Sequence, residues 1–188
     1  EKLLVPLLAK LGNLVVDGGI WLNTQRPEWN DANNAIVGTG LSMVTLYYMR
    51  RYVAFIQDLL KDTSGDVQLS VEVAQWVTAT ADILALANAL IEQGDVSSEA
   101  RSSVLRQLAS ASAAYRATVY QNGFTGKTSV DMSAVKKLLA ASLTVMDDSI
   151  RTNLRKDGLY NAYNIINYTA NTVDVDLLYP MLEGQVAV

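Results

Sequence analysis

The stretch "GLSMVTLYYMRRYVAFIQDLL", residues 40–60, decides the fold class that the sequence predicts. Its larger apolar residues recur at steps of three and four, as they do on one face of an α-helix. They are Leu41, Val44, Tyr48, Tyr52, Phe55 and Leu59. A face of this width covers the core of a helical domain. The stretch therefore predicts a long amphipathic helix that packs against other helices.

Three further stretches, 73–90, 104–119 and 135–154, carry the same helical spacing. Glycine follows these runs at positions 65, 94, 123 and 158, as is typical just past the end of a helix. Residues 13–23 suggest at most a short extended piece, and 170–180 alternates only briefly before a proline. The sequence thus predicts an all-α fold of antiparallel helical hairpins with short turns.

Composition limits the function classes. The 188 residues suit one helical domain over 1–188, and the net charge of −4 disfavours nucleic-acid binding. The absence of Cys and His excludes disulfides, Cys/His zinc sites and imidazole catalysis, and no cofactor is predicted. The uncharged run 32–49 contains Asn, Gly, Ser and Thr, so we expect a buried helix there and no membrane span. The compartment is not indicated.

The segment "TQRPEWNDANNAIVGTG", residues 24–40, has two interpretations. Pro27 brings the chain in extended, so Asn30 or Asp31 is a natural N-cap for a following helix. Alternatively, Glu28 and Asp31 are carboxyl groups of an active site. A carboxylate neighbour and the indole of Trp29 would both raise the pKa of a catalytic acid.

The residue types around this acidic pair suit a saccharide. Aromatic faces stack on the apolar faces of sugar rings, and Arg and Asn side chains hydrogen-bond to hydroxyl groups. Arg26, Trp29 and Asn30 are therefore candidate substrate-binding residues.

The stretch "EWNDANNAIVGTGLS", residues 28–42, resembles the Trp-Asn-Asp segment of the inverting disaccharide phosphorylases that act on cellobiose and chitobiose. The resemblance implies an (α/α)6 barrel, a glycoside or oligosaccharide substrate, Asp31 as the general acid and Trp29 in the sugar subsite. Glu28 stands where that family usually has Asp. Trp29, Asn30 and Asp31 match.

The resemblance also has consequences for the rest of the protein. The family's phosphate pocket uses histidine, so inorganic phosphate would bind through residues outside this chain. The chain has room for about half the helices of such a barrel. We therefore expect a fragment of a larger barrel, whose uncovered apolar faces favour self-association.

Water is the alternative attacking group. An inverting hydrolase needs a second carboxylate about 6.5–9.5 Å from the acid. The candidates are Glu28, Asp147, Asp148 and Asp157.

A second cluster is "RKDGLYNAYNIINY", residues 155–168. Tyr160 and Tyr163 are candidates for the second wall of the same cleft. The alternative is aromatic packing after a helix end. For the whole chain the alternatives are a glycoside hydrolase or phosphorylase-like catalytic piece, a noncatalytic helical domain that binds a glycan or a protein, and a structural helical bundle.

Overall fold

The computed structural model describes residues 1–23, 34–94 and 96–188, and its fold is mixed α/β. The helices are α1 (Leu4–Leu11), α3 (Met43–Leu59), α4 (Val71–Gln93), α5 (Ser98–Asn122), α6 (Met132–Thr152) and α7 (Leu182–Ala187). The strands are β1 (Leu14–Val15), β2 (Gly19–Trp21), β3 (Gly40–Ser42), β4 (Asp66–Ser70), β5 (Lys127–Asp131), β6 (Tyr163–Tyr168) and β7 (Val173–Leu177).

The all-α prediction is wrong, and with it the prediction of an α/α barrel. Five strands form one antiparallel sheet in the order β1-β2-β3-β6-β7, and β4 pairs with β5 in a second sheet. The first three strands have only two or three residues, which is too short for an alternating pattern to be visible. β3 is buried along its whole length, so it also shows no polar face.

The four long helices that the periodicity predicts are present. The core-facing side predicted for α3 is wrong, because Tyr48, Phe55 and Leu59 are exposed. The helix instead buries Leu46, Tyr47, Val53 and Ile56. Ser97 caps α5 by accepting a hydrogen bond from the backbone N–H of Ala100 (3.2 Å). Gly94 ends α4 in the left-handed conformation, with φ +69°. The predicted helix over the uncharged run 32–49 is wrong in part, because Gly40–Ser42 is a strand and α3 begins only at Met43.

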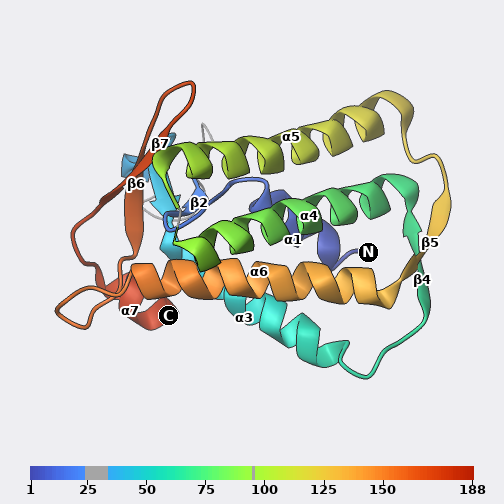
Figure 1. Cartoon of the computed structure of the whole chain (residues 1–188), viewed down its shortest axis with the longest axis horizontal. Coiled ribbons are helices and arrows are strands. Elements are labelled where there is room, and N and C mark those ends of the chain that lie inside the picture. Colours follow the sequence, from blue (N-terminus) through green and yellow to red (C-terminus); the bar gives the residue numbers. More distant parts are fainter. Residues whose placement is uncertain (24–33, 95) are drawn as a thin grey trace.

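In Figure 1 the long helices α5, α4 and α6 run side by side, with the five-stranded sheet at one end and the β4–β5 sheet at the other. Three of the helices begin directly where a strand ends. Ser42 closes β3 and caps α3, Ser70 closes β4 before α4, and Asp131 closes β5 and caps α6. The strands therefore fix where these helices start.

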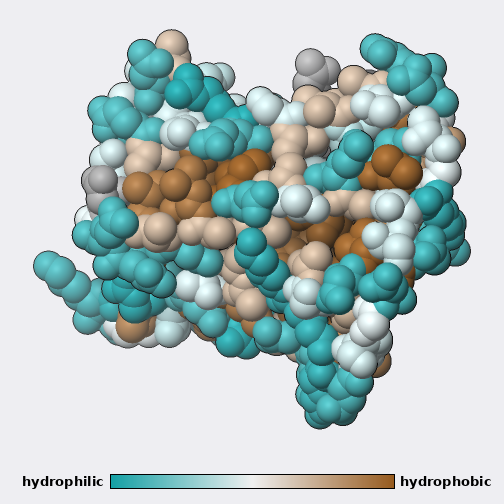
Figure 2. All heavy atoms as spheres, turned by 45° about the vertical axis from the view of Figure 1, so that its right-hand side comes forward, coloured by the Kyte–Doolittle hydropathy of each residue, from teal (hydrophilic) through white to brown (hydrophobic). Residues whose placement is uncertain are grey.

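The main core lies between the helices and the inner face of the sheet. Its largest fully buried side chains include Tyr47, Tyr163, Leu8 and Leu46. Figure 2 shows that apolar surface on the visible face is divided into patches by hydrophilic side chains. By length and composition α4 alone among the described helices could cross a membrane, and it packs against α1, α5 and α6. One such helix is weak evidence, because core helices pass the same test.

Candidate functional site

Hydrogen bonds join the two described segments that come before and after residues 24–33. The N–H of Leu22 donates to the carbonyl of Gly40 (2.8 Å), and the N–H of Gly38 donates to the carbonyl of Leu22 (3.0 Å). The last described residues before the segment and the first ones after it therefore lie next to each other, beside β2 and β3. The predicted site residues on this segment lie outside the described residues: Arg26, Glu28, Trp29, Asn30 and Asp31.

An aromatic pair lies at these flanks. The indole N–H of Trp21 donates to the carbonyl of Gly38 (2.9 Å), which fixes the ring next to the returning chain. The ring of Tyr168 lies 5.3 Å from that of Trp21, centroid to centroid, at an interplanar angle of 59°. Tyr168 is 60% exposed and Trp21 is partly exposed. The pair thus offers an accessible aromatic surface.

Strand register explains the meeting. β3 pairs with β2 on one side and with β6 on the other, and Gly40 lies opposite Ile165. Three residues farther along β6, the chain reaches Tyr168, beyond the end of β3. The second sequence cluster, 155–168, therefore does approach the flanks of the first, but through its last residue.

The two tyrosines singled out from the sequence are placed differently. Tyr163 is fully buried, and its hydroxyl donates to a carboxylate oxygen of Glu183 (3.0 Å). Tyr160 packs edge-on against Tyr47, with ring centroids 6.3 Å apart, and its backbone N–H donates to Gln185 (2.8 Å). Both tyrosines pack against neighbouring parts of the fold.

Polar groups flank Tyr168 on the β6–β7 hairpin. The Asn167 amide donates to a carboxylate oxygen of Asp176 (2.6 Å), and Asp174 accepts a hydrogen bond from the hydroxyl of Ser98. In the strand register, however, Asn167, Asp174 and Asp176 lie on the opposite face of the sheet from Tyr168, so they do not extend the aromatic surface. Trp21 and Tyr168 were not candidates from sequence, because no local pattern shows that β3 and β6 pair.

The three described carboxylates proposed as a second catalytic group are each held by an arginine. Asp147 pairs with Arg50 (2.8 Å), and Asp148 pairs with Arg151. Asp157 accepts a hydrogen bond from the backbone N–H of Leu159, which lowers the pKa of its carboxyl group, and the Arg155 guanidinium at 3.3 Å lowers it further.

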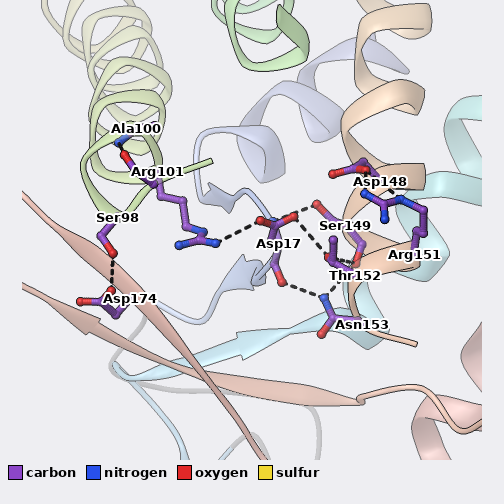
Figure 3. Close-up of polar contacts among 11 residues, drawn as sticks. Asp17, Ser98, Ala100, Arg101, Asp148, Ser149, Arg151, Thr152, Asn153 and Asp174 are labelled. Carbon is purple, nitrogen blue, oxygen red and sulfur yellow. Dashed lines mark hydrogen bonds and ion pairs between the residues drawn. The ribbon is translucent and has the colours of Figure 1, made fainter. Parts of the chain in front are cut away.

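A separate polar network fixes the turn between β1 and β2 (Figure 3). Asp17 lies at its centre with φ +64°, a left-handed conformation that is uncommon outside glycine but tolerated by Asp. Its carboxylate pairs with Arg101 of α5 (3.1 Å) and accepts a hydrogen bond from the hydroxyl of Thr152 of α6 (3.2 Å). The backbone N–H of Asp17 donates to the hydroxyl of Ser149 (3.1 Å).

Buried asparagines continue this network into the sheet. The Asn153 amide donates to the carbonyl of Asp17 (2.7 Å), and its oxygen accepts from Asn164 of β6 (2.8 Å) and Asn161 (3.2 Å). Asn164 also donates to the carbonyl of Gly18 (2.9 Å). Because most of these polar groups are paired with each other, the network joins the sheet to α5 and α6, and we assign it a structural role.

Within the described ranges no group of three or more acidic side chains is arranged to hold a metal ion. Comparison with known proteins adds no assignment. The sequence matches no protein-family model, and a search of curated proteins finds no match. The resemblance of residues 28–42 to the disaccharide phosphorylases stays a prediction.

Proposed function

We propose that the chain takes part in the cleavage of glycosidic bonds, with Asp31 as the general acid and the Trp21–Tyr168 pair as an aromatic platform for a sugar ring. The observation that carries the proposal is the position of this pair at the flanks of residues 24–33. Two partly exposed rings lie next to the residues that precede and follow the segment containing Asp31. A general acid and an aromatic platform do not require an α/α barrel.

The chemistry needs three contributions. Asp31 would protonate the leaving glycosidic oxygen, which requires a carboxyl group with a raised pKa. The aromatic pair would hold the ring by its apolar face. The attacking group is either water activated by a second carboxylate or inorganic phosphate held by residues outside this chain.

A noncatalytic glycan-binding role is the second candidate. The observation that favours it is that Asp147, Asp148 and Asp157 each pair with an arginine. A carboxylate engaged in this way is a poorer base for water. The aromatic platform serves either role, so the two differ only in turnover.

Turnover of aryl glycosides and of cellobiose, with and without phosphate, tests the proposal. We expect Asp31→Asn to lower turnover at least about a hundredfold, the usual range for loss of a general acid. Trp21→Ala and Tyr168→Ala should weaken sugar binding about three- to tenfold, as expected for one aromatic contact. Tyr179→Ala is the matched control, because Tyr179 is similarly exposed at 68%.

The outcomes separate the candidates. Binding that depends on Trp21 and Tyr168 without any turnover supports the noncatalytic role. Turnover that is equal in the wild type and Asp31→Asn removes Asp31 from the mechanism. If sugars neither bind nor turn over, both candidates fail.

A further inference from the structure

A row of apolar side chains, the α3 stripe, runs along the outer side of α3. At steps of four, three and four residues it consists of Tyr48, Tyr52, Phe55 and Leu59. Phe55 is 62% exposed, Tyr48 and Leu59 are 49% and 55% exposed, and Tyr52 is partly exposed. In Figure 1 α3 lies along the lower edge of the helix layer, with α6 as its neighbouring long helix. The stripe therefore faces solvent.

The spacing of the α3 stripe is that of a helix that packs against another helix. Alternating steps of four and three mark the core positions of a heptad repeat, where each side chain enters a hole formed by four residues of the facing helix. The core of the chain is filled by other residues of α3, such as Tyr47 and Ile56. The stripe is thus a second packing face on the same helix.

A hollow of about 310 Å³ opens at the start of the stripe. Four of its lining residues belong to α3, at positions i, i+3, i+4 and i+7: Thr45, Tyr48, Met49 and Tyr52. These are the positions that form a hole for a side chain of a facing helix. α1 adds Pro6 and Lys10 to the lining, and the Tyr52 hydroxyl donates to the carbonyl of Leu3 (2.8 Å). The hollow is therefore already shaped to receive an apolar side chain.

Opposite charges flank the stripe on one side. Arg51 directly precedes Tyr52, and Asp58 directly precedes Leu59, so the two charges occupy equivalent heptad positions. Arg51 lies over the ring of Tyr48, 4.9 Å from its centroid, and donates to the carbonyl of Ala187 through Nη2. Asp58 pairs with Lys61 (2.9 Å) through Oδ1, and its side chain is still 74% exposed. Both charged groups are accessible to a partner.

The order of these charges favours an antiparallel partner with the same sequence. If two copies of α3 run in opposite directions about a twofold axis between Tyr52 and Phe55, Arg51 of each copy lies beside Asp58 of the other. Two parallel copies would place Arg51 beside Ile56 of the second copy, which puts a charge against an apolar residue. A twofold arrangement also uses one patch on both copies and closes on itself.

The area of the patch fits a weak dimer. A fully covered aromatic side chain buries about 150–250 Å², so the half-exposed stripe with its flanking charges amounts to roughly 500 Å² per copy. Two copies bury about 1,000 Å², which is the lower limit for a specific interface. We therefore expect a reversible dimer with a dissociation constant on the order of 10 μM or weaker.

We propose that α3 is a dimerisation helix, which pairs antiparallel with α3 of a second copy of this chain about a twofold axis between Tyr52 and Phe55. Leu59 of each copy enters the hollow beside Tyr48 of the other copy. Arg51 of each copy pairs with Asp58 of the other. The pairing does not depend on the glycosidic activity proposed above.

Sedimentation equilibrium across the micromolar concentration range tests the dimer. We expect the mass to rise from that of one chain toward that of two. Phe55→Glu should abolish the rise, because it places a charge in the centre of the apolar interface. Phe124→Glu is the matched control, because it makes the same change at a 56% exposed position outside α3, and it should dimerise like the wild type.

Charge reversal tests the orientation. Arg51→Glu places two acidic side chains together at each ion-pair position, and Asp58→Arg places two arginines together. Each variant alone should dimerise at least about tenfold more weakly than the wild type. An equal mixture of the two variants brings opposite charges together at both positions, so it should form a mixed dimer with nearly wild-type affinity. Damage to the fold in either variant cannot produce such a recovery.

The proposal is overturned if the mass stays that of one chain, or if Phe55→Glu dimerises as well as Phe124→Glu. It is also overturned if the mixture of Arg51→Glu and Asp58→Arg dimerises no better than each variant alone. Circular dichroism of each variant establishes that it is folded. If Phe55→Glu does not fold, the mixture decides the question, because it leaves the apolar stripe intact.

Discussion

Asp17 places its carboxylate 3.1 Å from the guanidinium of Arg101, and both side chains are less than one-fifth exposed. The aspartate belongs to the tight turn between β1 and β2, and the arginine to the first turns of α5. The ion pair therefore joins the turn at the edge of the five-stranded sheet to helix α5. Partial burial strengthens the attraction between the two charges and also raises their desolvation cost, so the loss of one partner, which leaves the other charge unpaired, is destabilising.

We expect Asp17→Asn to lower the free energy of unfolding by about 1–3 kcal/mol. Asparagine tolerates the left-handed backbone and can keep the bond to Thr152, so the change isolates the charge. Urea unfolding of Asp17→Asn, Arg101→Met and the double variant measures the coupling. Additive effects of the two changes would show that the pair contributes no coupling energy.

Asn153→Ala should cost about 2–4 kcal/mol, because it leaves several buried polar groups without partners. The side chain is 1% exposed and bonds to Asp17, Ser149, Asn161 and Asn164. Asn171→Ala, in the exposed turn of the β6–β7 hairpin, is the control and should change stability by less than about 0.5 kcal/mol. Equal unfolding midpoints for the two variants would contradict a structural role for Asn153.

Gly19→Ala should destabilise the fold more than Gly65→Ala. Both glycines have positive φ, +114° and +82°, so each substitution strains the backbone by about 1 kcal/mol or more. A Cβ at Gly19 would also lie 2.9 Å from backbone atoms of Ser42, whereas one at Gly65 meets nothing within 4 Å. Thermal unfolding of the two variants gives the comparison. An equal decrease in Tm would mean that β2 and β3 move apart to make room for the added Cβ at little cost in free energy.

Asp131 should contribute a stability that disappears in acid. Hydrogen bonds from Ser133 lower its pKa below the usual 3.8, so the folded state favours the charged form. The stabilisation is present above about pH 4 and is lost as the pH falls through the lower pKa of the folded state. We expect a smaller decrease in unfolding free energy between pH 5 and about pH 2 in Asp131→Asn, which retains a capping oxygen. Identical pH profiles in urea unfolding would exclude this contribution.

The helices could be predicted from the sequence because their signal is local. The apolar spacing in 73–90 and 135–154 and the caps at Ser97 and Asp131 all lie within the helices or one turn away. The same reasoning missed Gly40–Ser42, because three buried residues between a turn and a helix resemble the start of the helix. β4 and β5 were missed because their last residues, Ser70 and Asp131, suit helix caps equally well.

The sites depend on contacts that no local pattern contains. Tyr160 and Tyr163 stood out for their residue type, yet Tyr163 is a core residue. Tyr168 and Trp21 meet only because β6 lies beside β3 and β3 beside β2. The hollow between α1 and α3 is likewise lined by residues that lie far apart in the sequence.

The direct passage from strand to helix at Ser42, Ser70 and Asp131 has a consequence for local unfolding of the protein. The first amide of α4, at Val71, donates to Gly126, and that of α6, at Met132, donates to Gly65. Fraying of either helix start therefore also removes the hydrogen bond at one end of the β4–β5 sheet. Amide protons on both elements should therefore exchange with deuterium together, as one cooperative unit, instead of the helix ends opening first.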